Sequence, residues 1–137
     1  MRIVLAALLL LSFAAPAQAA TPIVGRWITK DTKALVEIAP CGTRICGHIV
    51  KVLSGAKNAP SNDARNPDPK LRQRALAGLM VISDMVERGG VWQGKLYSPE
   101  DGLLVKGTLS RNDDGTLAVH GCAFLLICRD QVWHRAP

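Results

Sequence analysis

The sequence lacks the signatures of the common hydrolases and nucleotide-binding enzymes. It contains no G-x-S-x-G elbow, no H-E-x-x-H pair and no glycine-rich phosphate loop. It also lacks the aromatic-interleaved basic stripe of single-strand nucleic-acid binders, although its formal net charge is +6. No internal repeat or low-complexity segment is present. These absences argue against hydrolysis and nucleic-acid binding, while the basic charge fits a solvated surface or contact with a small anionic ligand.

Long apolar runs are confined to the beginning of the chain. A basic Met1-Arg2 pair precedes the apolar residues 3–11, and Ala17-Gln18-Ala19 follows. This order is typical of a secretory signal peptide, which we place at residues 1–19. The run is too short for a permanent transmembrane anchor, and no cysteine follows the expected cleavage site. We therefore expect a single exported domain, residues 20–137, in the periplasm.

Cysteine is scarce but even in number: Cys41, Cys46, Cys122 and Cys128. An oxidising compartment predicts disulfides, and each close pair suits the facing positions of a hairpin. We expect two local bridges, Cys41–Cys46 and Cys122–Cys128; a long-range pairing such as Cys41 with Cys128 is the alternative if the sheet closes. A zinc site is not expected, because C-x-x-C spacing and neighbouring histidines are missing. No metal or cofactor is predicted.

Alternation of apolar and polar residues predicts an all-β fold. The clearest segment is the hairpin 91–109, where Pro99 and the Asp101-Gly102 pair form the turn. On its first arm Trp92 shares a face with residues 94 and 96, and Tyr97 lies on the other face. Further strands are expected at 25–29, 33–39, 45–53, 79–84, 116–122 and 128–135. Eight short strands predict a small antiparallel up-and-down barrel, with a two-layer sandwich as the alternative.

One connection is unusually long and polar. Residues 54–69 are rich in proline, asparagine, aspartate and glycine. They lead into a short helix predicted at 70–78, with Asp68 as its cap, Pro69 at its start and Gly78 at its end. We expect this helix to cover one end of the barrel, because long connections in small domains usually have a structural or functional role.

Several spaced motifs together resemble a bacterial exported family called domain of unknown function 2147. They cover essentially the whole mature chain and comprise Gly25-x-Trp27, Cys41-Gly42, Cys46-Gly47-x-Ile49, Asp63-x-x-Asn66-Pro67, Leu71-Arg72-x-Arg74-x-Leu76-x-Gly78, Trp92-x-Gly94-Lys95-x-Tyr97-x-Pro99-Glu100-x-Gly102 and Gln131-x-Trp133-x-Arg135. The resemblance implies a small lipocalin-like barrel of Gram-negative envelopes and no established activity. After the turn glycine the family commonly carries a lysine and a polar aromatic residue. This chain has Leu103-Leu104-Val105 instead, which implies an altered site.

The lipocalin analogy gives two residues a structural role. A tryptophan on the first strand of such a barrel closes its bottom, and an arginine of the last strand stacks over the ring. Trp27 and Arg135 are placed for this pairing if the first and eighth strands are neighbours. The contact would contribute about 0.5–2 kcal/mol, depending on burial.

Polar residues around the long connection form the candidate ligand site. Asp63, Asn66, Arg72 and Arg74 would line a polar mouth, with Trp92 and Tyr97 as aromatic walls. In the alternative interpretation, which we favour, the same residues bond to the backbone and to one another and only fasten the connection. The three histidines are expected on separate strands and suggest no metal or catalytic centre; they are His48, His120 and His134.

An apolar segment, Phe124-Leu125-Leu126-Ile127, occupies the predicted loop between Cys122 and Cys128. Loop tips are normally polar, so we expect these residues to plug the barrel end. Alternatively they form an exposed surface for a membrane or a protein partner. The leading functional hypothesis is a non-enzymatic protein that binds a small or amphipathic ligand, or an envelope component. A protein-interaction module using residues 123–127 comes second, and an enzyme acting on envelope polymer through Asp63 and Arg74 third.

Overall fold

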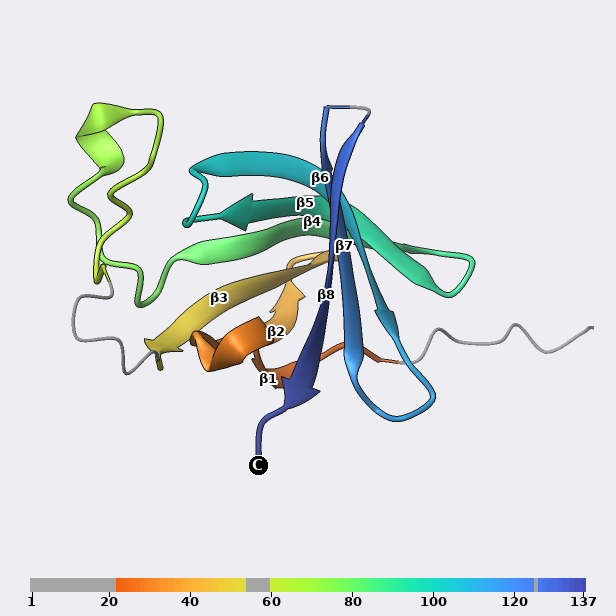
Figure 1. The fold of residues 1–137 in the computed structure, drawn as a ribbon. Helices are drawn as coiled ribbons and strands as arrows, with labels where there is room; N and C mark the ends of the chain where they lie inside the picture. Colours follow the sequence, from red (N-terminus) through yellow and green to blue (C-terminus); the bar gives the residue numbers. More distant parts are fainter. Residues whose placement is uncertain (1–21, 54–59, 125) are drawn as a thin grey trace, which may run out of the picture.

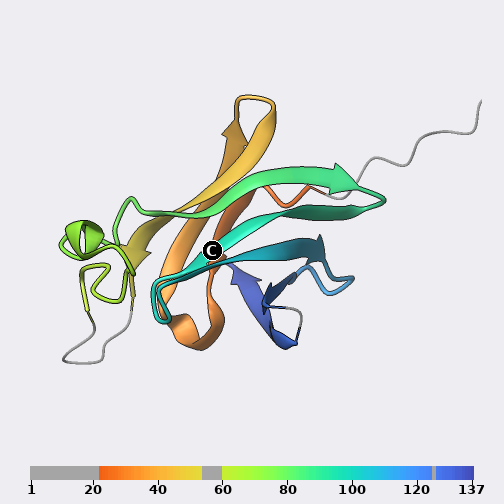
Figure 2. The same ribbon diagram turned by 90° about the horizontal axis from the view of Figure 1, so that it is seen from above.

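The protein forms a closed eight-stranded antiparallel barrel, seen from two directions in Figures 1 and 2. A computed structural model describes residues 22–53, 60–124 and 126–137, so the expected signal peptide lies outside the described residues. The strands are β1 (Gly25–Ile28), β2 (Ala34–Cys41), β3 (Arg44–Val52), β4 (Met80–Arg88), β5 (Val91–Ser98), β6 (Leu103–Arg111), β7 (Leu117–Ala123) and β8 (Ile127–Arg135). Each strand pairs with the next, and β8 pairs with β1. The predicted barrel is confirmed, and the sandwich is excluded.

Up-and-down connectivity sorts the connections between the two ends of the barrel. One end of the barrel, which we call the loop end, carries residues 29–33, 60–79, 99–102, 124 and 126. Tight turns at 42–43, 89–90 and 112–116 belong to the other, which we call the turn end. In Figure 1 the segment that follows β3 (yellow-green) stands beside the barrel rather than across it.

The core is concentrated toward the turn end. Trp27, Leu109 and Leu117 are fully buried there, and the Trp27 indole donates a hydrogen bond to the carbonyl of Ile23 at 2.9 Å. Arg135 lies over the Trp27 ring, 4.9 Å from its centroid, as the resemblance implied. A second guanidinium, that of Arg111, lies 5.1 Å from the same centroid. Large side chains and two cation–π contacts therefore close this end.

Closure of the barrel depends on a short ladder. Strands β1 and β8 share only two register pairs, Trp27↔Arg135 and Ile28↔His134, beyond which the Ala136 amide donates to the Arg26 carbonyl at 3.0 Å. By contrast, β7 and β8 pair over seven positions, from Leu117↔Trp133 to Ala123↔Ile127. The first and last strands are thus joined by the smallest backbone pairing of the barrel.

Three glycines form a row across the inner face of neighbouring strands. Gly94 on β5 pairs with Gly107 on β6, which pairs with Gly121 on β7. A Cβ on Gly107 would meet the carbonyl oxygen of His120 at 2.7 Å and the Leu96 side chain even closer. This row removes bulk from the interior, so the strands curve tightly and Leu96 fills the space over the glycines.

Both local disulfides are present, Cys41–Cys46 and Cys122–Cys128, and the long-range pairing is excluded. The predicted helix at 70–78 is shorter than expected. Only Pro69–Leu71 is helical, a 3-10 turn (η2) capped by Asp68, whose carboxylate accepts from the Lys70 amide at 2.9 Å. A second 3-10 turn, η1, spans Lys30–Thr32.

The helix stops early because its continuation pairs with the incoming chain. The amide of Leu76 donates to the carbonyl of Ser61 at 2.8 Å, and the amide of Asp63 donates to that of Arg74 at 3.0 Å. These bonds use backbone groups that a longer helix would need for itself. Residues 61–76 consequently form a loop whose two arms are joined by backbone hydrogen bonds.

Candidate functional site

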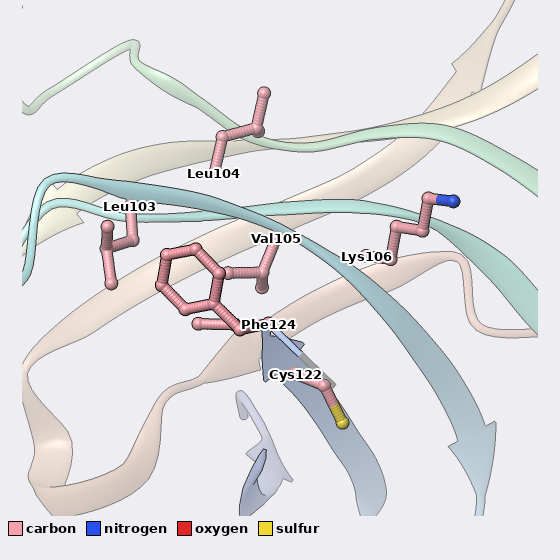
Figure 3. A pocket seen from close by; sticks show the side chains of 7 residues that line it. Leu103, Leu104, Val105, Lys106, Cys122 and Phe124 are labelled. Carbon is pink, nitrogen blue, oxygen red and sulfur yellow. The ribbon is translucent and has the colours of Figure 1, made fainter. Parts of the chain in front are cut away.

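A pocket of about 460 Å³ opens at the loop end of the barrel, along β6 and the beginning of the β7–β8 turn. Its lining is mainly apolar and consists of Leu103, Leu104, Val105, Lys106, Cys122, Ala123 and Phe124. Figure 3 shows the Phe124 ring beside Val105 and Leu103, while Leu104 and Lys106 project from the opposite face of the strand. Lys106 is the one charged group among these seven residues.

Strand alternation explains this lining. Leu103 and Val105 belong to the inward face of β6, which continues into the buried Gly107 and Leu109. Along β6 the buried residues end at Gly107, and Leu103 remains 43% exposed. The pocket contains the Leu103-Leu104-Val105 segment in which the chain departs from the resembled family.

Charged contacts hold the β5–β6 turn beside the pocket. The Asp101 carboxylate accepts from Arg129 on β8 at 2.6 Å and from the Ser98 hydroxyl at 2.9 Å. The neighbouring Glu100 carboxylate bonds the ammonium of Lys33. Its backbone carbonyl accepts from Arg65 at 2.8 Å, which joins the turn to the long connection. These carboxylates therefore fix the position of the turn.

The predicted polar cluster centres on Asp63, whose side chain is 0% exposed. One carboxylate oxygen accepts from the Tyr97 hydroxyl at 2.6 Å. The other accepts from the Asn66 amide at 2.8 Å and from Arg74, whose Nε and Nη2 lie 2.9 and 2.8 Å away. Asn66 also donates to the Tyr97 oxygen at 3.0 Å, so the network is closed.

Ionisation of the buried carboxyl depends on this network. Burial disfavours the charged form most strongly, but hydrogen bonds from Tyr97, Asn66 and Arg74 together outweigh it and hold the pKa of Asp63 below its ordinary value. Burial first, and then the bond to Asp63, raise the pKa of Tyr97. Asp63 is thus an ionised, fully partnered group that joins the long connection to the outer face of β5.

The remaining predicted site residues divide between two places. Arg72 lies next to the Asp63 network and donates to the carbonyl of Asn66 at 2.8 Å. Trp92 does not join it: the ring packs against the barrel core, and its buried Nε1 has no hydrogen-bond partner among the described atoms. Asp63, Asn66, Arg72, Arg74 and Tyr97 therefore come together as a fastening network, and their ligand-binding role stays a prediction.

The expected plug is wrong for the described part of the apolar loop. Phe124 is 84% exposed and Leu126 is 92% exposed, and Leu125 lies outside the described residues. Phe124 has a positive φ of 55°, a left-handed turn conformation that is uncommon for a residue other than glycine. The two described tip residues present an apolar surface to solvent.

Sequence reasoning missed one constellation entirely. This constellation consists of His120, Cys122 and Cys128. A ring nitrogen of the histidine and the two cysteine sulfurs lie within 4.8 Å of one another. The signal was available, because His120 and Cys122 are two positions apart on one strand and must share a face. Our statement that no histidine neighbours the cysteines was therefore incorrect.

Comparison with known proteins identifies the family. Residues 25–135 match the family described as "Uncharacterized protein conserved in bacteria (DUF2147)", and the chain belongs to it. No match was found among curated proteins. The described residues include no helix long and apolar enough to traverse a bilayer.

A solved structure shows the same fold. Protein HP1028 from the human pathogen Helicobacter pylori, described as belonging to the lipocalin family, matches with a TM-score of 0.71. The two chains are 22% identical, and the match covers 86% of this chain and 85% of that one. The fold of the present chain is accordingly lipocalin-like.

Proposed function

We propose that this member of the family is an exported, non-enzymatic protein that binds a small amphipathic ligand at the loop end of its barrel. The pocket carries the proposal: about 460 Å³ is within the usual range of small-molecule sites, which is roughly 300–1,000 Å³. Its position opposite the end closed by Trp27 supports entry from the loop end. The Asp63 network lies on the outer face of β5 and serves to hold the neighbouring connection in place.

The lining indicates the chemistry of the ligand. Leu103, Val105 and Phe124 offer apolar contact for a hydrocarbon portion. Lys106 forms no ion pair with a described carboxylate. Its side chain leaves β6 on the face opposite Leu103 and Val105, so its ammonium would meet an acidic head group at the rim of the pocket, outside the apolar lining. We infer a ligand with an apolar chain and an acidic head, which the basic net charge also favours.

Binding is tested by isothermal titration with decanoate, with decanol and acetate as comparators. Val105→Asp should weaken decanoate binding by about tenfold or more, because it places a like charge in the pocket. Val132→Asp adds the same charge on an exposed position of β8, outside the pocket lining, and should have little effect. Lys106→Gln should weaken decanoate but not decanol, whereas Lys51→Gln should change neither.

Absence of decanoate binding to the native protein, or equal losses for the two aspartate variants, would contradict the proposed pocket.

Export requires a separate measurement. Protein recovered from a periplasmic extract should begin near Ala20 and contain no free thiol. Intact protein starting at Met1 in the cytoplasm would exclude it.

The exposed apolar tip supports a second candidate, a protein-interaction module. Phe124, Leu126 and Ile127 are 84%, 92% and 61% exposed. Native mass spectrometry of the purified periplasmic protein separates the two functions. A bound small molecule supports the pocket, and a second polypeptide that dissociates after Leu126→Ser supports the tip.

A further inference from the structure

The outer face of β7 and β8 carries a compact array of reactive side chains. His120 and Cys122 alternate on β7, and Cys128 and Asp130 alternate on β8. The strand register sets His120 opposite Asp130 and Cys122 opposite Cys128. All four side chains point away from the core, and only Cys122 also borders the pocket, so neither the pocket ligand nor the Asp63 network accounts for the array as a whole.

The histidine connects the carboxylate to the disulfide. Its Nδ1 lies 2.5 Å from a carboxylate oxygen of Asp130, and its Nε2 lies 3.3 Å from the sulfur of Cys122. A hydrogen on Nδ1 satisfies Asp130, which leaves Nε2 directed at the sulfur. When the ring is protonated, Nε2 carries a hydrogen that it can donate to this sulfur.

The two sulfurs have different surroundings. Besides the His120 imidazole, Cys122 has Lys106 as its register partner on β6, on the same outer face of the sheet. Cys128 is more exposed and lies on the same face as the Asp130 carboxylate, two residues away. Neighbouring cations stabilise a thiolate and a carboxylate does not. Cys122 is therefore the better leaving group, and Cys128 is the more accessible sulfur.

We propose that Cys122–Cys128 is a redox-active disulfide that exchanges with an external thiolate, while Cys41–Cys46 is structural. The incoming thiolate attacks the sulfur of Cys128 and forms a mixed disulfide there. The Cys122–Cys128 bond breaks, and its electron pair leaves on Cys122, which takes a proton from Nε2 of His120. A second thiolate then attacks the external sulfur of the mixed disulfide, and the electron pair of the broken bond leaves on Cys128, which takes a proton from water. The two external sulfurs leave joined as a disulfide, and the pair Cys122 and Cys128 is left reduced.

The fold permits this cycle. Five further register pairs join β7 and β8 below the bond, from Leu117↔Trp133 to Gly121↔Arg129. They hold the strands together when the bond is open. The exposed side chains of Phe124 and Leu126 follow directly on β7 and precede β8, so a thiol on an apolar polypeptide segment would find contact beside the bond. The chemistry is that of a thiolate, whether on a polypeptide or on a small peptide such as glutathione.

The test isolates one disulfide in the full mature protein. In a Cys41→Ser/Cys46→Ser background, glutathione should open the bond at least tenfold faster than in the same protein carrying His120→Gln. Lys106→Gln provides a second variant with the same direction of effect. After full reduction, iodoacetamide should alkylate Cys122 faster than Cys128, and His120→Gln should abolish this preference. Circular dichroism verifies that each variant folds.

Equal rates with and without the imidazole, or preferential alkylation of Cys128, would overturn the proposal. The reciprocal protein, Cys122→Ser/Cys128→Ser, should react more slowly, because Cys46 is buried and has no described histidine in hydrogen-bond contact. Two further arms identify the source of the thiolate. A cysteine peptide with apolar flanks that outpaces glutathione indicates a polypeptide substrate, and equal rates indicate low-molecular-weight thiols.

Discussion

Arg129 on β8 donates a 2.6 Å hydrogen bond to the carboxylate of Asp101 in the turn between β5 and β6. The neighbouring Glu100 is held by Lys33, which precedes β2. Adjacent carboxylates of one turn are thus bound from two different parts of the loop end. Turn propensity alone explained both acidic residues in the sequence, whereas the structure gives each a partner.

Removing these partners should loosen the turn without unfolding the barrel. Arg129→Gln and Lys33→Gln are each expected to lower the free energy of unfolding by less than about 1 kcal/mol, because the two basic side chains are 65% and 48% exposed. Amide exchange at Asp101 and Gly102 should accelerate in the double variant. A loss above about 2 kcal/mol for either single change would show that the pair is structural.

Gly102 should tolerate no side chain. Its φ is +65°, and a Cβ there would overlap the backbone carbonyl of Arg65. Gly42 has nearly the same φ of +64°, but no atom lies within 4 Å of the position that an added methyl group would take, so Gly42→Ala tests the conformational cost alone. That cost is about 1–2 kcal/mol. Urea denaturation should show a clearly larger loss for Gly102→Ala, and similar losses would mean that the long connection simply moves aside.

Tyr97→Phe should destabilise the protein while leaving ligand affinity unchanged. The change deprives a fully buried carboxylate of its 2.6 Å donor, and hydrogen bonds to charged groups contribute about 1.5–3 kcal/mol. Ser98→Ala removes a hydroxyl from the more exposed Asp101 carboxylate and should cost less. If Tyr97→Phe instead weakened decanoate binding at unchanged stability, the Asp63 cluster would be a binding site after all.

The depressed pKa of Asp63 predicts how stability depends on pH. An unfolded aspartate titrates near 3.9, and the folded group titrates lower, so its contribution is complete above pH 4 and disappears as the pH falls through the folded pKa. The difference in unfolding free energy between the native protein and Asp63→Asn should be constant from pH 7 to about pH 5. It should shrink below about pH 4. Asp114 also has a lowered pKa, but it is present in both proteins and cancels in the difference.

Strand periodicity was sufficient for the barrel and favoured the two local disulfides, because each close pair of cysteines suits facing positions of a hairpin, but it left the long-range pairing open. The same alternation places Trp92 and Tyr97 on opposite faces of β5. The prediction that both rings are walls of one site therefore conflicted with the strand pattern itself. Alternation would also have placed His120 beside Cys122. Local pattern was enough for these features.

Other features depend on contacts between distant segments. The helix shortens because Ser61 and Asp63 bond to the returning chain, and nothing local in residues 70–78 specifies that. Predicting the pocket requires knowing that burial along β6 ends at Gly107, which pairs with glycines on both neighbouring strands. The exposure of Phe124 could not be predicted from its hydrophobicity, which favours burial.

The two-residue ladder between β1 and β8 is the seam along which the closed barrel is held by the fewest backbone pairs. If thermal fluctuations or a bulky ligand were to open the barrel, β1 and β8 would separate first. The cation–π contact between Arg135 on β8 and Trp27 on β1 opposes this separation. Once separated, β1 and β8 would be edge strands that could pair with a neighbouring molecule. By opposing that separation, Arg135 would also disfavour strand exchange and aggregation.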